Sequence, residues 1–589
     1  MYLASEMPSS SFQSIIHSAS QQIIVSGNYL TSSSGQDCLS DPYLNLWGYI
    51  SAMSSDHIVE SVYPTSVTPS MGRDAKEKDE TVVSAASASD NEENSSGIAN
   101  DEHPTGNDIP LKWKLTSIIL VSMIGFGSHW SSGITGAMKS TIKKEMKINN
   151  KQYALLSASQ DFMVTALMLV SGVVTDRIGG AGAIFYGNII FTIGSVLIAG
   201  AAQTRNYQFM IGGTIVQAFG DIATQVAQYK VFSSWFAPNH GFASTLALEL
   251  GIGKIGAFVG KSSANIISQN TGNFANVYWV SVAMNLFCNL MTLGFYIFTR
   301  YANKKFPSTA DPATGEKLTE GNKSFELRKV LELPWTFWVV LSFSLFETSV
   351  ANLFTNNATE MAEQRLGVSS VRAGWYTSAV QYGGFFFVPL IGIFVDIWGN
   401  RITLFAVMGL SVLTSMSVIN WAPSIHGTDA AFGIYAFAYC FGPTLIVDSI
   451  RTSMWHQSVF GSAVALKLTL NNAMSIIVNI VAGVIQDSDH NSYNKVTNLY
   501  VALAAGAAVV ALLMVALSYF CIDFRILQYT RKQRVANGQL INERKERFHN
   551  MNGGRNRRVS MWCFAALVVL VAGSWCAYFW GVATGHNNG

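Results

Sequence analysis

The chain has few charged residues for its length. Lys, Arg, Asp and Glu make up 13% of its 589 residues, whereas soluble domains carry roughly a quarter. A formal net charge of +2 gives no support for a nucleic-acid partner. The sequence also lacks the Gly-x-x-x-x-Gly-Lys-Ser/Thr phosphate loop, which argues against a pump that hydrolyses nucleotides.

Cysteine is sparse as well. The six cysteines, at positions 38, 288, 440, 521, 563 and 576, show neither paired nor metal-ligand spacing, and we interpret them as packing residues. No His, Cys and carboxylate cluster has the spacing of a metal or nucleophile site. His129 stands alone in its apolar run, where packing or hydrogen bonding is its expected role. We therefore expect that the protein is not an enzyme and that it binds neither a metal ion nor a cofactor.

Long apolar runs are what the chain has instead. A bilayer core of about 30 Å needs about 20 helical residues, and the 49 glycines suit membrane helices that pack backbone to backbone. Twelve runs are long enough, and a thirteenth, 561–582, follows a basic stretch. The twelve lie at 115–138, 152–174, 181–202, 207–233, 241–268, 274–300, 334–356, 372–395, 401–422, 429–451, 460–486 and 497–522. The pattern predicts an all-α membrane protein of two six-helix halves plus one further helix.

The runs also divide the chain into parts. We expect a disordered, cytosolic Ser-rich tail (1–110), followed by a first six-helix half (111–301), a cytosolic central loop (302–333) and a second six-helix half (334–522). A basic cytosolic linker (523–560) and an extra span with a short tail (561–589) complete the chain.

The distribution of Lys and Arg predicts the orientation. The central loop and the linker are basic, whereas loops 269–273 and 423–428 carry no Lys or Arg, so the former are expected in the cytosol. The first outer loop is an exception, with Lys139, Lys143, Lys144 and Lys147. This orientation places the C-terminus outside and predicts Asn357 as an exposed glycosylation site there; the sequons at Asn94 and Asn322 would be cytosolic.

One loop occurs twice, 220 residues apart (172 to 392, 176 to 396 and 179 to 399). The copies are Gly172-x-x-x-Asp176-Arg177-x-Gly179 and Gly392-x-x-x-Asp396-x-x-Gly399-x-Arg401. A duplicated membrane unit is typical of secondary transporters. Each Asp follows the second span of its half, where a carboxylate can accept from helix N-terminal amides, and each second Gly allows a tight turn. We expect the motif to control movement between states without contacting substrate.

Two charges lie near the expected midplane. Asp221 is 14 residues past Tyr207, roughly 21 Å into its span, and Lys254 is 13 residues past Gly241, about 20 Å into its own. A charge at that depth costs several kcal/mol unless it faces a partner or a cavity. One reading is a buried pair that fixes helix register. Because desolvation nearly cancels the attraction in such pairs, we favour a substrate or coupling role.

Four further charges lie within the expected spans. Asp161 and Glu347 reach a similar depth and are candidates for coupling. Glu249 and Lys467 lie about a third of the way in from the cytosolic side, on the fifth and eleventh spans. They are gate candidates, with a snorkelling lysine as the alternative for Lys467.

The repeated loop resembles the signature of the major facilitator superfamily. A closer likeness runs through Phe219-Gly-Asp221…Trp235-Phe236 and Leu246…Lys254-Ile-Gly256, and again through 470–487. These stretches are similar to the branch that contains the lysosomal dipeptide transporters. The resemblance covers residues 113–522.

The resemblance implies roles for particular residues. In that branch an acidic residue on helix four binds the dipeptide amine and a basic residue on helix five binds its carboxylate; by position these are Asp221 and Lys254. Here Asp replaces a longer Glu, and Lys replaces Arg, which loses bidentate carboxylate geometry. Further substrate-binding candidates are Gln225, Glu347, Asn471 and Asn472.

The function expected from all of this is secondary transport of a small zwitterionic solute, chiefly dipeptides, by alternating access. A proton-coupled carrier of another organic solute is one alternative. A transporter-like nutrient sensor, suggested by the long tail, is another. The likeness favours a vacuolar or lysosome-like membrane over the plasma membrane. Partners besides the bilayer would be the small-molecule substrate and an accessory glycosylated membrane subunit.

Overall fold

The computed structural model describes residues 111–305, 331–455, 459–550 and 554–585, and within these all regular structure is helical. The Ser-rich tail, most of the central loop and the sequons at Asn94 and Asn322 lie outside the described residues. Of Gly172, Asp176 and Arg177 only the backbone is described, and it belongs to a helix.

The N-terminal half consists of six long helices and one short one. They are α3 (Leu111–Ala137), α4 (Lys139–Met146), α5 (Asn150–Ile178), α6 (Gly180–Thr204), α7 (Tyr207–Trp235), α8 (Phe242–Thr271) and α9 (Ala275–Lys305). Asn149 begins α5 with a capping box, because its side chain accepts from the Gln152 amide and that of Gln152 accepts from the Asn149 amide. The expected close glycine packing is found between α6 and α7, where a Cβ at Gly220 would lie 2.2 Å from the Phe191 nitrogen.

The C-terminal half repeats the arrangement. Its helices are α11 (Trp335–Leu366), α12 (Ser370–Trp398), α13 (Arg401–Trp421), α14 (Ile425–Tyr439), α15 (Gly442–Ser453), α16 (Phe460–Ser488) and α17 (Val496–Phe520). The tenth span was predicted as a single helix, but it is broken at Cys440 and Phe441 into α14 and α15. A proline stands in the first turn of α15. Discontinuous helices of this kind often border the substrate site of a transporter.

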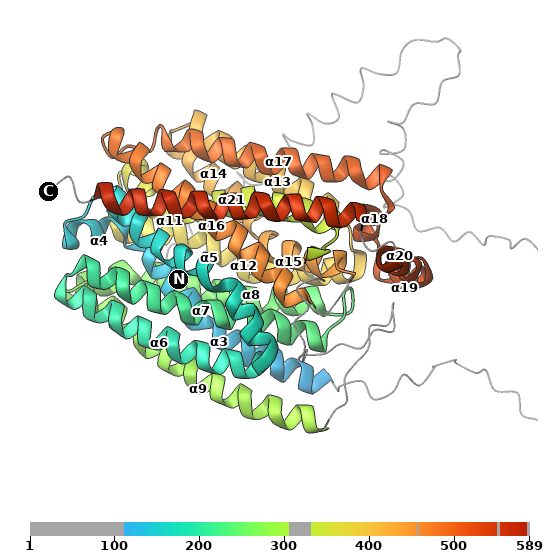
Figure 1. The fold of residues 1–589 in the computed structure, drawn as a ribbon. Helices are drawn as coiled ribbons and strands as arrows, with labels where there is room; N and C mark the ends of the chain where they lie inside the picture. Colours follow the sequence, from blue (N-terminus) through green and yellow to red (C-terminus); the bar gives the residue numbers. More distant parts are fainter. Residues whose placement is uncertain (1–110, 306–330, 456–458, 551–553, 586–589) are drawn as a thin grey trace, which may run out of the picture. The chain divides into compact units, whose positions relative to one another are not determined.

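Equivalent helices join the two halves. The second span of the first half, α5, packs against α16, and the fifth, α8, packs against α12. The helices run roughly alongside one another, with α4 at one end of the bundle and the short helices α18 to α20 at the other (Figure 1). We call these the α4 end and the α20 end.

The C-terminal extension is helical throughout most of its described length. It contains α18 (Ile522–Arg525), the 3₁₀ turn η3 (Ile526–Gln528), α19 (Arg531–Ala536), α20 (Gly538–Asn550) and α21 (Gly554–Gly585). Helix α21 lies against α16 and α5, and so against both halves. Near its start the Trp338 Nε1 donates to Ser560 (3.1 Å), and near its end Tyr578 shares a hydrogen bond with Ser159 (3.0 Å).

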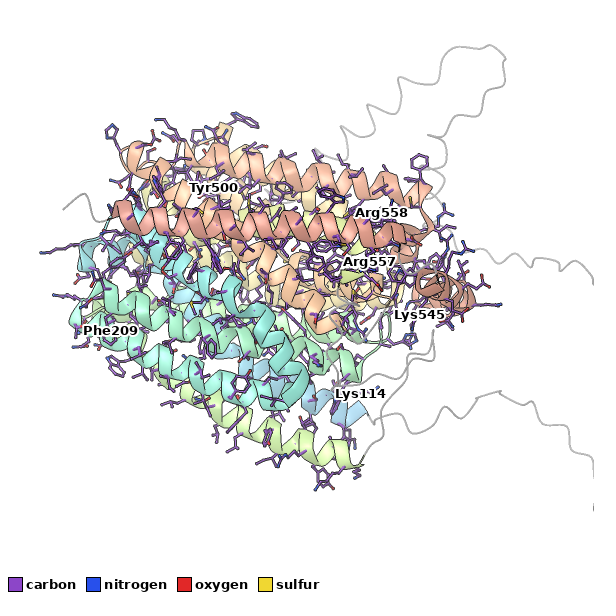
Figure 2. The ribbon with its side chains drawn as sticks, viewed as in Figure 1. Lys114, Phe209, Tyr500, Lys545, Arg557 and Arg558 are labelled. Carbon is purple, nitrogen blue, oxygen red and sulfur yellow. The ribbon has the colours of Figure 1, made fainter. Side chains whose placement is uncertain are left out.

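Ten of the described segments are long and apolar enough to cross a membrane, α14 with α15 forming one of them and α21 another. The remaining long helices, α3, α5 and α7, are interrupted by more polar residues. Each of the twelve predicted core spans therefore corresponds to a helix or a broken helix. Basic side chains gather at the α20 end, where Lys114, Lys545, Arg557 and Arg558 lie (Figure 2), and this is the end that the Lys and Arg distribution assigns to the cytosol.

Helix α21 gives a topology that can be tested. A tag inserted between Asn550 and Gly554 and a tag after Gly589 should lie on opposite sides of the membrane, because α21 runs from the α20 end to the α4 end. In sealed vesicles, protease added to the cytosolic face should remove the first tag only. Removal of both tags from that face would show that α21 does not cross.

Candidate functional site

A polar cluster lies inside the N-terminal half, where α3, α7 and α8 supply its side chains. The Asp221 carboxylate accepts a hydrogen bond from Gln225 one turn away (2.9 Å). His129 lies close enough to Asp221 for a protonated imidazole to interact with it, and its Nε2 is 3.9 Å from Glu249 Oε1. The sequence suggested that His129 stands alone, but α3 packs beside both α7 and α8, and this places His129 near two carboxylates.

A second cluster brings Lys254 to the C-terminal half. Its Nζ lies 3.2 Å from the centre of the Tyr439 ring, a cation–π contact. Tyr439 is the last residue of α14, directly before the break in the tenth span. Glu347, only 4% exposed, lies within electrostatic reach of both Lys254 and Lys467, and Thr348 donates to its carboxylate (3.1 Å).

Asp221 and Lys254 do not pair with each other. In the described part of the chain each has its own partners, Gln225 for the carboxylate and the Tyr439 ring for the ammonium. The reading of a buried pair that fixes helix register is therefore wrong. Two opposite charges remain in separate polar surroundings, each held by an uncharged side chain.

The gate candidates also differ from expectation. The ion contact of Glu249 is with His129 of its own half, and the carboxylate near Lys467 is Glu347, again of its own half. No ion pair joins Glu249 to Lys467 among the described residues, so the predicted gate between them is not formed in this conformation.

The remaining candidates are two asparagines on α16 and one aspartate on α5. Asn471 is buried and exchanges hydrogen bonds with Ser344 (2.9 and 3.3 Å), so its polar groups are already used. Asn472 is half-buried on the same helix. Asp161 is half-buried on α5, and its carboxylate receives no hydrogen bond or ion pair from the described residues. Asp161 is thus the candidate whose charge most requires a ligand or a proton.

The second copy of the repeated motif joins the halves at the α20 end. The Asp396 carboxylate accepts from the Ser244 amide (2.7 Å), the Ser244 hydroxyl (2.5 Å) and the Ala243 amide (3.4 Å). These groups belong to the first turn of α8. The expected contact with helix N-terminal amides is present, but the amides come from the opposite half instead of the next helix in sequence.

The glycines and the arginine of this copy complete the junction. A Cβ at Gly392 would lie 2.3 Å from that of Ala247, so Gly392 permits the close approach of α12 to α8. Gly399 adopts φ +67°, which favours glycine. Arg401 is fully buried and donates to Asp448 (2.5 Å) and to Asn239 of the α7–α8 loop (2.9 Å).

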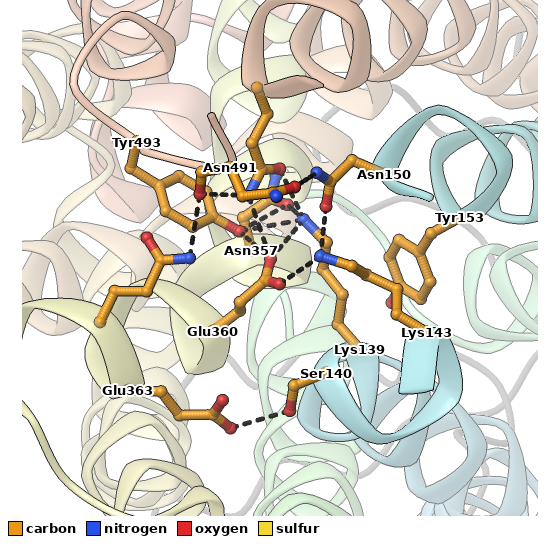
Figure 3. A network of polar contacts seen from close by, with 12 residues as sticks. Lys139, Ser140, Lys143, Asn150, Tyr153, Asn357, Glu360, Glu363, Asn491 and Tyr493 are labelled. Carbon is orange, nitrogen blue, oxygen red and sulfur yellow. Dashed lines mark hydrogen bonds and ion pairs between the residues drawn. The ribbon is translucent and has the colours of Figure 1, made fainter. Parts of the chain in front are cut away.

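At the α4 end a buried network joins the halves, which the sequence did not reveal (Figure 3). Glu360 of α11 lies 2.8 Å from Lys139 and 2.6 Å from Lys143, and Tyr493 donates to it (2.6 Å). Lys139 also donates to Asn357 (2.7 Å) and to Gln486 (2.9 Å). These six residues, Lys139, Lys143, Asn357, Glu360, Gln486 and Tyr493, are called the Glu360 network. Asn150 and Asp487 extend it with a hydrogen bond of 2.8 Å.

Burial makes Lys139 dependent on its partner. Desolvation lowers the pKa of Lys139 to about 8, against the opposing attraction of Glu360. The network also explains why basic residues occur in the first outer loop. Lys139 and Lys143 are ion-paired across the halves, so they do not behave as free loop charges in the orientation rule.

Asn357 belongs to this network, and the expectation of an exposed glycosylation site there is wrong. Its side chain is 8% exposed, donates to the Leu353 carbonyl (2.8 Å) and accepts from Lys139. The sequon lies within α11, because the seventh span continues about three turns beyond the predicted boundary at residue 356. A glycan could not be attached without opening the network.

Comparison with known proteins agrees with this architecture. Residues 121–477 match the model of the Major Facilitator Superfamily, and the chain belongs to this family. It is 22% identical over 393 residues to the human protein named lysosomal dipeptide transporter MFSD1, covering 64% of this chain and 81% of the human protein. The proton:xylose symporter XylE has a similar fold (TM-score 0.55, 12% identity, 72% of this chain and 99% of XylE). The Escherichia coli fucose:proton symporter FucP is likewise similar (TM-score 0.52, 13% identity, 72% and 100%). The chain is therefore a multi-pass membrane transporter and not an enzyme.

Substituting Asp396 should loosen the α20 end. Asp396→Asn removes the charge that faces the first turn of α8, an interaction worth up to about 2 kcal/mol, or roughly thirtyfold in a two-state population. Spin labels at Ile178 and Trp398, exposed and equivalent positions of the two halves, should show longer distances. An unchanged distance distribution in the folded variant would contradict a role in holding this end closed.

Substituting Glu360 should destabilise the fold. Glu360→Gln leaves Lys139 and Lys143 buried without an anion, and breaking a buried pair costs about 3–5 kcal/mol. Denaturant titration in detergent should report the loss. Glu363→Gln is the matched control. Glu363 is half-buried and accepts a hydrogen bond of 3.0 Å from Ser140, but forms no ion pair among the described residues, so this change should cost about 1 kcal/mol. Equal losses would mean that the ion pairs do not hold this end together.

Proposed function

We propose that the protein transports a small zwitterionic solute, chiefly dipeptides, by alternating access. The observation that carries the proposal is the separation of Asp221 from Lys254: both lie inside the helical bundle, and each is held by a neutral side chain. Retaining opposite charges in a membrane interior without pairing them is costly. A ligand with an amine at one end and a carboxylate at the other would satisfy both.

The surroundings of the two charges support the same substrate class. Asp221 and Glu249 both lie near His129. Asp221 provides a negative charge for an amine, with Gln225 as a neighbouring amide. Lys254 provides a positive charge for a carboxylate, and the Tyr439 ring that now covers its ammonium could give way to the ligand. Relatives named lysosomal dipeptide transporters add support over 64% of the chain, at an identity too low to carry the substrate by itself.

The position of Glu347 supports a second candidate function, that of a proton-coupled carrier. Its carboxylate is buried in the C-terminal half and lies near Lys254 and Lys467. Protonation of Glu347 would change the charge that Lys254 experiences, and this would link a proton to the carboxylate-binding residue. Asp161 is the other coupling candidate, because its carboxylate has no described partner.

The inter-half contacts supply the gating that such a carrier needs. Asp396 with the start of α8 would hold the α20 end, and the Glu360 network would hold the α4 end. Transport requires each set to break in turn, with substrate binding shifting the balance between them. A vacuolar or lysosome-like membrane, suggested by the relatives' names, and an accessory glycosylated subunit remain predictions.

Substitutions at the two charges should separate the ends of the ligand. Asp221→Asn should weaken binding of dipeptides with a free amine and leave N-acetylated analogues nearly unaffected. Lys254→Ala should weaken binding of dipeptides with a free carboxylate and leave amidated dipeptides nearly unaffected. Each lost charge-assisted contact should cost about 1.5–3 kcal/mol, or roughly ten- to hundredfold in affinity. Thermal shift and counterflow with Ala-Ala and its blocked forms would measure this.

Two outcomes would reject the assignment. Equal weakening of blocked and unblocked dipeptides would show that neither residue contacts the ligand ends. Loss of folding in both variants would show that the charges are structural. Gln217→Ala is a control on the same helix as Asp221; its side chain donates to Ser195 of α6 (2.9 Å), so it should leave the preference between blocked and free ends unchanged.

A further inference from the structure

The segment that follows the last core helix docks at the junction of the two halves. After α17 the chain turns through α18 and η3, where Phe524 and Leu527 are fully buried. Trp335, at the start of α11, packs against Phe524 (ring centres 4.9 Å apart) and donates to Asp523 (3.4 Å). The sequence predicted this stretch as a basic linker, whereas its beginning is part of the hydrophobic core.

Gln528 fastens this segment to the C-terminal half. Its side chain accepts from the Ile402 amide (3.1 Å) and donates to the Thr403 hydroxyl (3.0 Å), and its carbonyl accepts from the Asn400 amide (3.3 Å). The preceding Leu527 carbonyl accepts from Arg401 (3.3 Å). The contact is tight, since a Cβ at Gly399 would lie 2.1 Å from the Tyr529 oxygen. The turn of the repeated motif is thus the docking site.

The next residues reach the N-terminal half. Asn239, in the loop between α7 and α8, donates to the Tyr529 carbonyl (3.3 Å). Arg534 of α19 donates to the Pro238 carbonyl of the same loop (2.8 Å) and is only 4% exposed. Residues 528–534 therefore bind the α12–α13 turn of one half and the α7–α8 loop of the other.

This position makes the segment an obstacle to opening. If the α20 end opens during transport, the α7–α8 loop and the α12–α13 turn must move apart. Residues 528–534 are joined to α17 through α18 and η3. Together with Leu527 they make four hydrogen bonds with the α12–α13 turn and the start of α13. Among the described residues, two hydrogen bonds join the segment to Pro238 and Asn239, and we expect these to break when the loop and the turn separate.

We propose that residues 528–534 form a built-in latch that keeps the α20 end closed and must release Pro238 and Asn239 before that end can open. The latch rests on the proposed alternating access. It is held near its site from both sides, by α17 before it and by α21 after it, where α21 is bonded to α5 through Trp575 and Thr165 (2.9 Å). Such tethering keeps its local concentration high, so the latch can reform after each opening.

Distance measurements without any ligand test the latch. The full chain, with its cysteines replaced and spin labels at Ile178 and Trp398, would be placed in lipid nanodiscs. Arg534→Ala removes the bond to Pro238 and should raise the fraction of long distances about threefold or more by shifting the closed–open equilibrium. Arg531→Ala is the matched control, because Arg531 lies on the same short helix and is exposed; it should leave the distribution unchanged.

A second manipulation avoids the risk that Arg534→Ala misfolds. A protease site inserted between Asn550 and Gly554 allows the tether to be cut after folding, and cleavage should raise the long-distance fraction in the same direction. Unchanged distances in both the folded Arg534→Ala variant and the cleaved protein would overturn the latch. An equal increase for Arg531→Ala would overturn it too, because the effect would then not depend on the Pro238 contact.

The same preparation separates the latch from transport itself. If Asp396→Asn lengthens the distances and wild-type vesicles take up Ala-Ala, while latch disruption changes nothing, the latch fails and the proposed function stands. If latch disruption opens the α20 end but no zwitterionic solute is taken up, the latch stands and the substrate proposal fails.

Discussion

The arrangement of the helices depends on the free-energy cost of placing a charged side chain inside a membrane. A charge among lipid-facing helices is costly unless a partner, a cavity or a ligand meets it, and this chain meets the cost in different ways at different depths. At each end of the bundle, a carboxylate of one half contacts the other half. Glu360 forms ion pairs with two lysines at the α4 end, and Asp396 accepts hydrogen bonds from the first turn of α8 at the α20 end. Inside the bundle, Asp221 and Lys254 directly contact neutral side chains, and Glu347 lies within electrostatic reach of Lys254 without an ion pair in the described part of the chain. That contrast separates gates from a binding site.

The two ends are closed by different chemistry although the halves are repeats. At the α20 end a carboxylate of the repeated motif faces backbone amides of the other half, a contact with a helix terminus that salt screens little when it is buried. At the α4 end the bonds are ion pairs to Glu360, including one from a lysine that burial makes reluctant to keep its proton. The two ends therefore differ in the chemistry that closes them: a carboxylate with backbone amides at the α20 end, and buried ion pairs at the α4 end.

The C-terminal extension adds a contact that the two-half architecture does not require. Its first part occupies the junction at the α20 end, and α21 lies along α5 and α16, one helix from each half. Both parts therefore touch helices that must move relative to each other in an alternating-access cycle. An extension placed in this way can change how often the halves separate without touching the ligand.

The sequence by itself determined the helical class, the two six-helix halves and the extra apolar helix, because span length and a motif repeated at a fixed offset are local properties of a chain. It also placed Asp221, Lys254 and Glu347 inside the spans. It could not determine their partners: pairing of Lys254 with Tyr439, of His129 with Glu249, and of Asp396 with α8 arises from helices distant in sequence. The Glu360 network left one trace, lysines in a loop expected to lack them. Asn357 and the linker were misjudged because burial is decided by what packs against a residue, which only the tertiary structure supplies.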